Sequence, residues 1–416
     1  MKDMPEARGG RGFFEEQAGR YGRVFADSEA AVQAMWHDGL PRDTVIWTGA
    51  PALYLNPEIP TERIDTLGRD GFARLADVSA GIARAIFDAT MDGAPHPNAA
   101  FALASVPLKE EHLLYRGMML CDEDLSKPCV VAHAVFEDDP NAVLHSRFNP
   151  RWQELLPEEG PGSPLVYHFT ATLRDAVSVP GAVDVSPSLL ERVSFEPTSS
   201  LIYRASVELS RLVPQRVVRR SCWLLGVSPL GKEVASNLVG KGFVPRLLSA
   251  NPAPLNQARE RAEELSNATI AATREGNLAL LRQIVLPPVA ERIQARLEKA
   301  ILDAAIEYFR WTDGWRQRLS RLGGKAMHHR AVLRYDLTPH GLAAAQELET
   351  GGIPFCIGQH GVTNEIRAPR PTDALTWETA VGGLFCAYSE KSAELSSGSP
   401  YARGRAAAVG ASADMA

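Results

Sequence analysis

The stretch Gly351-Gly352-Ile353-Pro354-Phe355-Cys356-Ile357-Gly358-Gln359-His360-Gly361 decides the fold class of this chain. An apolar run that opens with a Gly-Gly turn is typical of a strand covered on both faces of a parallel sheet. Ligands of such sheets bind at the carboxyl ends of the strands, where this chain places His360 near two glycines. Glycine lets a ligand approach the backbone, and histidine can carry a proton or donate to a phosphate. The sequence therefore predicts a ligand site at this strand end.

A strand–helix–strand unit leads into this stretch. The apolar run 331–335 ends in Asp336, and Thr338-Pro339 has the pattern of a helix start, with Thr338 as N-cap. The helix is expected from Gly341 to Thr350 and to end in a left-handed cap at Gly351-Gly352. Such a unit, about thirty residues long, predicts parallel strands joined by a right-handed crossover.

Two more apolar runs follow, at 384–388 and 406–410, and the first of them ends in Ser389-Glu390 before another helix. If these strands are neighbours, their tips stand about 5 Å apart. We therefore expect Asp336, His360, Ser389 and Glu390 to line one rim of the sheet.

Composition describes an ordinary soluble globular protein. The 416 residues are 45% hydrophobic and 23% charged, which suits two or three domains. A formal charge of −6 gives no general attraction to nucleic acid. The five cysteines form no CxxC pair and no metal-type spacing, so reduced thiols, a cytoplasmic location and no metal site are expected.

Targeting signals are not evident. The N-terminus lacks the apolar core of a signal peptide, and no uncharged apolar stretch approaches eighteen residues. At most a peripheral association with the inner face of a membrane is compatible with this pattern.

The chain divides into a flexible tail (1–20), an N-terminal α/β domain with irregular elaboration (21–200) and a second α/β region (201–416). Further strand–helix–strand patterns occur at 23–48 and 222–248, a long helix at 68–89, strands at 112–120, 128–136 and 165–169, and a helical segment at about 254–320. Alternating strands and helices predict the α/β class, with Rossmann-like parallel sheets and helices on both faces.

His360 is the leading catalytic candidate, either as a general base on a hydroxyl or as a group that stabilises a leaving phosphate. Gln359 either orients the loop or binds a sugar hydroxyl. The candidate site continues through Gly361, Thr363, Asn364 and Glu365, and Glu365 is either a base or a solvated loop acid.

Several features have ordinary structural interpretations. Asp336 is interpreted either as a turn residue or as a catalytic carboxylate. Ser389 with Glu390 forms either a phosphate-binding helix start or a plain serine N-cap. His340, one turn into its helix, is interpreted as surface polarity. The segment 226–232 lacks the full phosphate-loop pattern, and the arginines of 204–220 suggest a solvated face.

The stretch 330–413 resembles a segment of bacterial surface-polysaccharide glycosyltransferases of the GT-B type, which have two Rossmann-like domains. In that family one strand carries a Gly-Ile-Pro…Gln-His-Gly pattern, here Gly352-Ile353-Pro354 through Gln359-His360-Gly361. In the family, a strand that ends in Ser-Glu follows this one, and then a strand that ends near Val-Gly. The corresponding residues here are Ser389-Glu390 and Val409-Gly410. The match covers about a fifth of the chain.

This resemblance implies transfer of a sugar from a nucleotide-sugar donor to a glycan acceptor, with His360 in the cleft and no cofactor. In the family a second nucleotide-binding domain follows the Val-Gly strand, whereas this sequence ends at Ala416, which suggests an incomplete GT-B-like fold. Either an earlier part of the chain supplies the donor site, or the chain is a non-catalytic or truncated acceptor-domain subunit that needs a partner chain. Another nucleotide-dependent α/β enzyme remains the third alternative.

Overall fold

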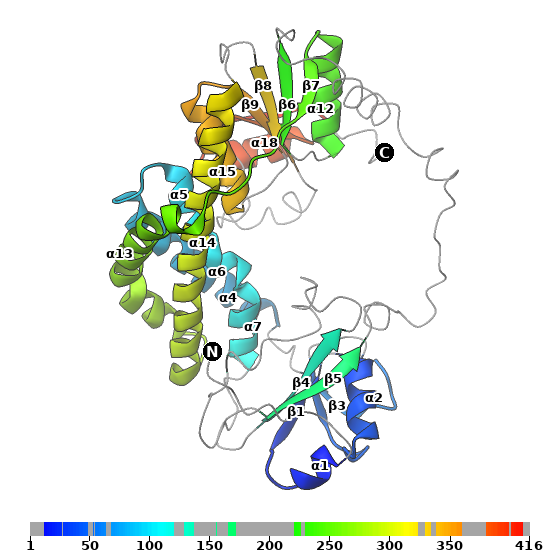
Figure 1. Cartoon of the computed structure of the whole chain (residues 1–416). Coiled ribbons are helices and arrows are strands. Elements are labelled where there is room, and N and C mark those ends of the chain that lie inside the picture. Colours follow the sequence, from blue (N-terminus) through cyan, green and yellow to red (C-terminus); the bar gives the residue numbers. More distant parts are fainter. Residues whose placement is uncertain are drawn as a thin grey trace, which may run out of the picture. The chain divides into compact units, whose positions relative to one another are not determined.

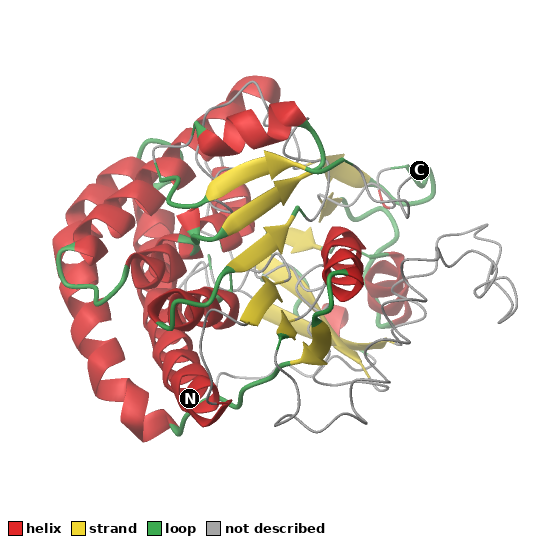
Figure 2. Ribbon diagram, turned by 90° about the horizontal axis from the view of Figure 1, so that it is seen from above, coloured by secondary structure: helices red, strands yellow, loops and turns green. Residues whose placement is uncertain are grey.

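The structure is a computed structural model (Figure 1). It describes residues 12–26, 28–48, 53, 55–63, 68–119, 129–136, 155, 165–171, 220–225, 229–322, 329–333, 338–359, 380–398 and 401–410. The chain forms two compact units. The first unit comprises Met1–Val78, Glu110–Val185 and Leu278–Arg296, and the second comprises Ser79–Lys109, Ser186–Asn277 and Leu297–Ala416. Both contain a parallel sheet flanked by helices, so the predicted Rossmann-like α/β class is confirmed (Figure 2).

The first unit contains a five-stranded parallel sheet in the order β3-β2-β1-β4-β5. Its strands are β1 (Arg23–Phe25), β2 (Ile46–Thr48), β3 (Thr61–Arg63), β4 (Cys129–Phe136) and β5 (Leu165–Ala171). Helix α2 (Glu29–His37) joins β1 to β2, as the strand–helix–strand pattern at 23–48 predicts. Among the described strands, the 3-2-1-4-5 order matches five consecutive positions of the 3-2-1-4-5-6 order of a Rossmann sheet.

Apolar side chains of the inner strands form the core of this sheet. Val24, Ile46 and Val130 are buried together with Met35 of α2 and with aromatic rings of the short helix α1 (Phe13–Glu16). Tyr167 of β5 is also buried there, and its hydroxyl donates to Asp38 Oδ2 at 2.7 Å. Burial, followed by the contact with Asp38, raises the pKa of Tyr167 well above its ordinary value.

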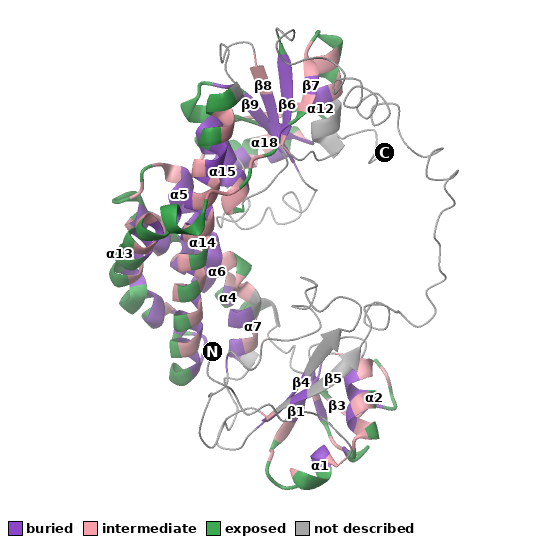
Figure 3. Cartoon of the chain, viewed as in Figure 1, coloured by how far each residue is buried: buried purple, intermediate pink, exposed green. Residues whose placement is uncertain are grey.

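The second unit contains a six-stranded parallel sheet in the order β11-β10-β9-β8-β6-β7. Its strands are β6 (Ser221–Leu225), β7 (Val244–Leu247), β8 (His329–Leu333), β9 (Phe355–Gly358), β10 (Leu384–Ala387) and β11 (Arg405–Ala408). Strands β8 to β11 arise from the four C-terminal apolar runs and are neighbours in chain order, as predicted. Figure 3 shows β6 as a buried strand.

Helices cover both faces of the six-stranded sheet. Helix α12 (Pro229–Gly240) joins β6 to β7, and its Ala235 packs with Leu224 and Val332. Successive residues of a strand face opposite ways, so Leu225 and Leu333 point to the other face. There they lie near helices α14 (Pro287–Leu322) and α15 (Pro339–Thr350).

The ends of α15 follow the sequence signals. Thr338 is the N-cap and Pro339 the first helical residue. At the other end Gly352 has φ +64°, and the N–H of Ile353 donates to the carbonyl oxygen of Leu348 at 2.9 Å. This is the left-handed glycine termination that the Gly-Gly pair predicts, and it turns the chain directly into β9.

The predicted helical segment 254–320 forms α13 (Leu255–Leu281) and α14. Apolar residues repeat every four positions along α14, and Val289, Ile293, Leu297, Ile301, Ala305 and Phe309 are all buried. Further helices are α4 (Gly68–Met91), α5 (Pro97–Ala104), α6 (Val106–Lys109), α7 (Glu111–Met119) and α18 (Glu390–Ser397). The prediction of a strand at 112–120 is therefore wrong, because that segment forms helix α7. Within the part of the chain that is described, no helix is both long and apolar enough to cross a membrane.

Candidate functional site

A cavity of about 370 Å³ lies at the carboxyl ends of β6, β7 and β8 in the second unit. From β6 the chain moves outward to β7, and it then returns to the other side of β6 to form β8. The space between β6 and β8 is thus the point at which the strand order reverses. Open parallel sheets bind their ligands in the crevice outside the carboxyl ends of the strands at such a point.

One wall of this cavity, the leucine wall, comes from the strand ends. Leu225 is the last residue of β6, Leu333 is the last residue of β8, and Leu248 follows β7 directly. Leu248 and Leu333 are buried. This wall offers apolar surface without hydrogen-bonding side chains.

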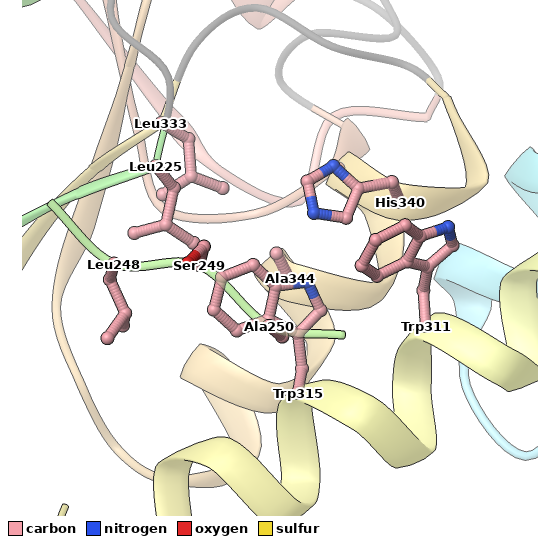
Figure 4. Close-up of a pocket in the computed structure, with 10 residues that line it drawn as sticks. Leu225, Leu248, Ser249, Ala250, Trp311, Trp315, Leu333, His340 and Ala344 are labelled. Atoms are coloured by element: carbon pink, nitrogen blue, oxygen red, sulfur yellow. The ribbon is translucent and has the colours of Figure 1, made fainter. Parts of the chain in front are cut away.

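The opposite wall, the aromatic wall, consists of Trp311, Trp315 and His340 (Figure 4). The two tryptophans lie one turn apart on α14, so both rings emerge on the same side of the helix. The His340 ring centroid lies 4.2 Å from that of Trp311 and 5.6 Å from that of Trp315, with interplanar angles of 59° and 28°. The imidazole is therefore held against both indoles.

The start of α15 sets the position of His340. The Thr338 hydroxyl oxygen accepts a hydrogen bond from the Gly341 N–H at 3.3 Å, and Pro339 fixes the backbone of the first turn. His340 is consequently the second helical residue, where the N–H groups of a helix favour negative charge. The cavity thus combines apolar walls with a helix N-terminus at its edge.

Close packing of the β7–α13 loop on α14 fixes the third side. The backbone N–H of Ala253 donates to the Arg310 carbonyl oxygen at 2.9 Å, and Arg310 Nε donates to the Ala253 carbonyl oxygen at 3.1 Å. A Cβ on Gly314 would clash with the Asn251 carbonyl oxygen, so only glycine fits there. The same loop carries Ser249 and Ala250 into the cavity.

Helices α14 and α15 are also joined by a buried polar network. The Tyr308 hydroxyl donates to Gln346 Oε1, and Gln346 Nε2 donates to Glu347 Oε1 at 3.1 Å. Arg316 completes the network with an ion pair to Glu347 at 3.0 Å. Satisfied networks of this kind hold elements rigidly, so the two helices that build the aromatic wall keep one relative position.

The indole N–H of Trp315 is the one group of the cavity lining whose partner is missing among the described residues. The side chain is 1% exposed, and Nε1 has no acceptor within hydrogen-bonding distance. Buried indole N–H groups usually find a partner, so the Trp315 N–H is an exception in this part of the structure.

The predicted rim at β9 and β10 is only partly within the described residues. Gln359 is buried after β9, and its Oε1 accepts hydrogen bonds from the Tyr388 N–H at 2.8 Å and from the Ser392 hydroxyl at 3.1 Å. Ser389 is the N-cap of α18, with its oxygen accepting from the Ser392 N–H at 3.1 Å, and Glu390 begins that helix in an exposed position. Asp336, His360, Gly361, Thr363, Asn364 and Glu365 lie outside the described residues.

The structure brings Gln359 and the Ser389 turn together on the neighbouring strands β9 and β10. The aromatic wall was not predicted. His340 was interpreted as surface polarity, yet it is half-buried against the two indoles. The available signals were the histidine just after a Thr-Pro helix start and the two tryptophans four residues apart on a helix otherwise interpreted as packing.

Of the described residues, no three His, Cys, Asp or Glu side chains are grouped to hold a metal ion. The described residues of this edge offer aromatic, amide, hydroxyl and imidazole groups beside a helix N-terminus. Comparisons of the chain with protein-family models, with curated proteins and with solved structures found no match.

Proposed function

We propose that this protein is a glycosyltransferase of bacterial cell-surface polysaccharide biosynthesis, transferring a sugar from a nucleotide-sugar donor to a glycan acceptor. The observation that carries the proposal is the cavity at the reversal point between β6 and β8. Doubly wound sheets bind nucleotides at this place. Two Rossmann-like sheets in one chain support the GT-B type, which the Gln359-His360-Gly361 pattern suggests.

In this proposal the second sheet presents two groups of residues at its carboxyl edge. The cavity beside α15 receives the donor, and the segment after β9 carries the chemistry, with His360 as base or phosphate-stabilising group and Asp336 and Glu365 as candidate carboxylates. Binding of the substrates is assigned to Gln359, Gly361, Thr363, Asn364, Ser389 and Glu390. The acceptor is a glycan, and the protein works in the cytoplasm or at the inner face of the membrane.

A second candidate is a nucleotide-dependent α/β enzyme of another class. It is favoured by the cavity walls themselves, since leucines and aromatic rings suit a nucleotide without being specific for a sugar. The two candidates differ in the ligand that stabilises the folded protein.

The test is a thermal-denaturation screen with nucleotide sugars, free nucleotides and nicotinamide dinucleotides, followed by assays of sugar transfer to glycan acceptors. The proposal expects stabilisation by a nucleotide sugar and release of its nucleotide when an acceptor is present. Stabilisation by a dinucleotide alone would instead support the second candidate.

Replacing His360 by alanine should lower sugar transfer by about a hundredfold or more, because general acid–base groups contribute on the order of 10² to 10⁴. Turnover is measured as nucleotide release, and folding is checked by circular dichroism. His37→Ala, which removes an exposed histidine at the end of α2, is the matched control and should retain activity. Unchanged turnover in His360→Ala would remove this imidazole from the mechanism.

A further inference from the structure

We propose that the protein docks on anionic lipid bilayers through the edge of its six-stranded sheet at which the strands begin, where cationic and apolar side chains gather. This edge lies opposite the carboxyl ends of the strands and therefore opposite the cavity. The inference does not rest on the proposed function, because it uses none of the residues assigned to the donor or the acceptor.

The six strands are parallel, so the residues at which they begin lie along one edge, the amino edge. Neighbouring strands lie about 4.8 Å apart, which makes the row roughly 24 Å long. In spatial order, the residues at or next to the strand starts are Phe243 (β7), Arg220 (β6), Arg330 (β8), Pro354 (β9), Leu384 (β10) and Arg405 (β11).

The amino edge is positively charged. Arg220 and Arg405 are exposed, and so is Lys241 in the turn that leads into β7. None of the six strand starts is an acid. Glu349, at the end of α15, does not offset these charges, because Arg403 Nη2 donates to both of its carboxylate oxygens, at 2.8 and 2.9 Å.

The ring of Phe243 gathers two of the cations at one end of the row. The Cζ atoms of Arg220 and Arg330 lie 5.9 and 5.8 Å from its centroid, within the range of cation–π attraction. Arg330 is also fixed by its Nη1, which donates to the His329 carbonyl oxygen at 2.8 Å. Positive charge is therefore held in place beside the exposed Lys241.

Apolar side chains accompany the cations along the row. Leu384 is 38% exposed, and the pairing of β10 with β11 places it directly beside Arg405. Pro354 is exposed before the start of β9. Binding to a bilayer surface grows with the apolar area that enters the headgroup region and with the attraction of cations to anionic lipids. The amino edge offers both.

The layout favours a bilayer over nucleic acid. Proteins that bind single strands stack bases on exposed aromatic rings, whereas Phe243 already lies against two guanidinium groups. The chain as a whole carries a formal charge of −6, so an anionic surface attracts it only through a locally positive face. The amino edge is such a face, and it is broad rather than centred on one point.

The test is co-sedimentation of the purified full chain with vesicles of phosphatidylglycerol and phosphatidylcholine in equal parts, and with vesicles of phosphatidylcholine alone. At low ionic strength the chain should sediment with the anionic vesicles and not measurably with the neutral ones. Salt at about 0.5 M should release most of it, because the Debye length falls to about 4 Å.

Arg220→Gln combined with Lys241→Gln should lower the partition coefficient about 25-fold, since each cation near an anionic surface contributes about fivefold. Arg405→Gln tests the far end of the row and should lower it about fivefold. Leu384→Ser keeps every charge and should lower it severalfold by removing the apolar contact. Lys391→Gln removes an exposed cation at the start of α18, on the carboxyl edge of the same sheet, and should bind as wild type does.

Equal sedimentation of wild type and the Arg220→Gln, Lys241→Gln variant, with folding verified by circular dichroism, would overturn this inference. Failure of the wild type to bind anionic vesicles, or equal binding to both kinds of vesicle, would overturn it too. A single-stranded DNA oligonucleotide that binds in place of vesicles, and less well to the same variant, would assign the edge to nucleic acid instead. Nucleotide-sugar turnover in solution should be unchanged in these variants, so the proposed function stands or falls separately.

Discussion

At the scale of single residues, Gln359 shows how a buried amide fixes the end of a strand. The side chain is 0% exposed, and its oxygen accepts from both the Tyr388 N–H and the Ser392 hydroxyl. Gln359→Leu removes this acceptor and leaves two buried donors unsatisfied, each at a cost of about 1–3 kcal/mol. We expect the free energy of unfolding to fall by about 2–4 kcal/mol, measured by urea denaturation.

Ser392→Ala is the matched control, because it removes only one of the two donors and leaves the Tyr388 bond in place. Its loss of stability should be the smaller of the two, about 1 kcal/mol. Equal losses in the two variants would show that the amide oxygen does not hold the β10–α18 turn as described.

The same residues show what local sequence can predict. Thr338 and Ser389 are caps whose partners lie three residues away, so their roles follow from the sequence alone. The role of His340 depends on Trp311 and Trp315, which belong to a different helix. Nothing within a few residues of His340 indicates those rings, and for this reason the aromatic wall was missed.

At the scale of elements, α7 shows how tertiary contacts decide between helix and strand. A short apolar segment at 112–120 suits either element, and a strand was predicted. In the structure Leu113, Leu114 and Met118 are buried on one side of a helix. A Cβ on Gly117 would lie 2.9 Å from Ile293 Cδ1, so α7 packs tightly on α14. That contact is distant in sequence and could not be foreseen.

The contact between helix α14 and the β7–α13 loop gives a prediction at this scale. The loop can approach α14 closely because Gly314 has no side chain. Gly314→Ala would push its Cβ into the Asn251 carbonyl oxygen, so the loop that carries Ser249 and Ala250 must move. We expect a loss of about 1–3 kcal/mol, in the range of overpacked sites, together with weaker ligand binding at the cavity. Chemical denaturation and calorimetry measure the two effects.

Gly276 supplies the contrast, since it also lies inside a long helix, α13, but a Cβ there meets nothing within 4 Å. Gly276→Ala should therefore stabilise the protein, by up to about 1 kcal/mol, through helix propensity. Were both variants stabilising, the close approach at Gly314 would be refuted.

At the scale of the whole molecule, the sequence predicts parallel strands better than it predicts their order. The apolar runs from 331–335 to 406–410 form neighbouring strands in chain order, which is the common arrangement for consecutive strands. The pairing of β6 with β8, and of β1 with β4, joins segments separated by long helical or irregular stretches. Pairing between segments so far apart leaves no pattern in the local sequence. The reversal of strand order between β6 and β8 was therefore found only in the structure.

The cysteines report on how the two units unfold. Cys129 lies in the five-stranded sheet and Cys222 in the six-stranded sheet, and both are buried. Burial raises the pKa of Cys129 and raises that of Cys222 to about 12. At pH 8 the native thiols are therefore protonated and covered, and a thiol reagent should label them only when the surrounding sheet opens.

Three of the boundaries between the two units fall inside continuous helices, in α4, α13 and α14. Each of these three helices therefore contributes residues to both units. We therefore expect Cys129 and Cys222 to become labelled at the same urea concentration, which peptide mass spectrometry can measure for each cysteine separately. Cys386 shares a sheet with Cys222 and should follow it, as an internal control. Labelling of Cys129 and Cys222 at clearly different urea concentrations would mean that the units unfold independently and that the shared helices do not couple them.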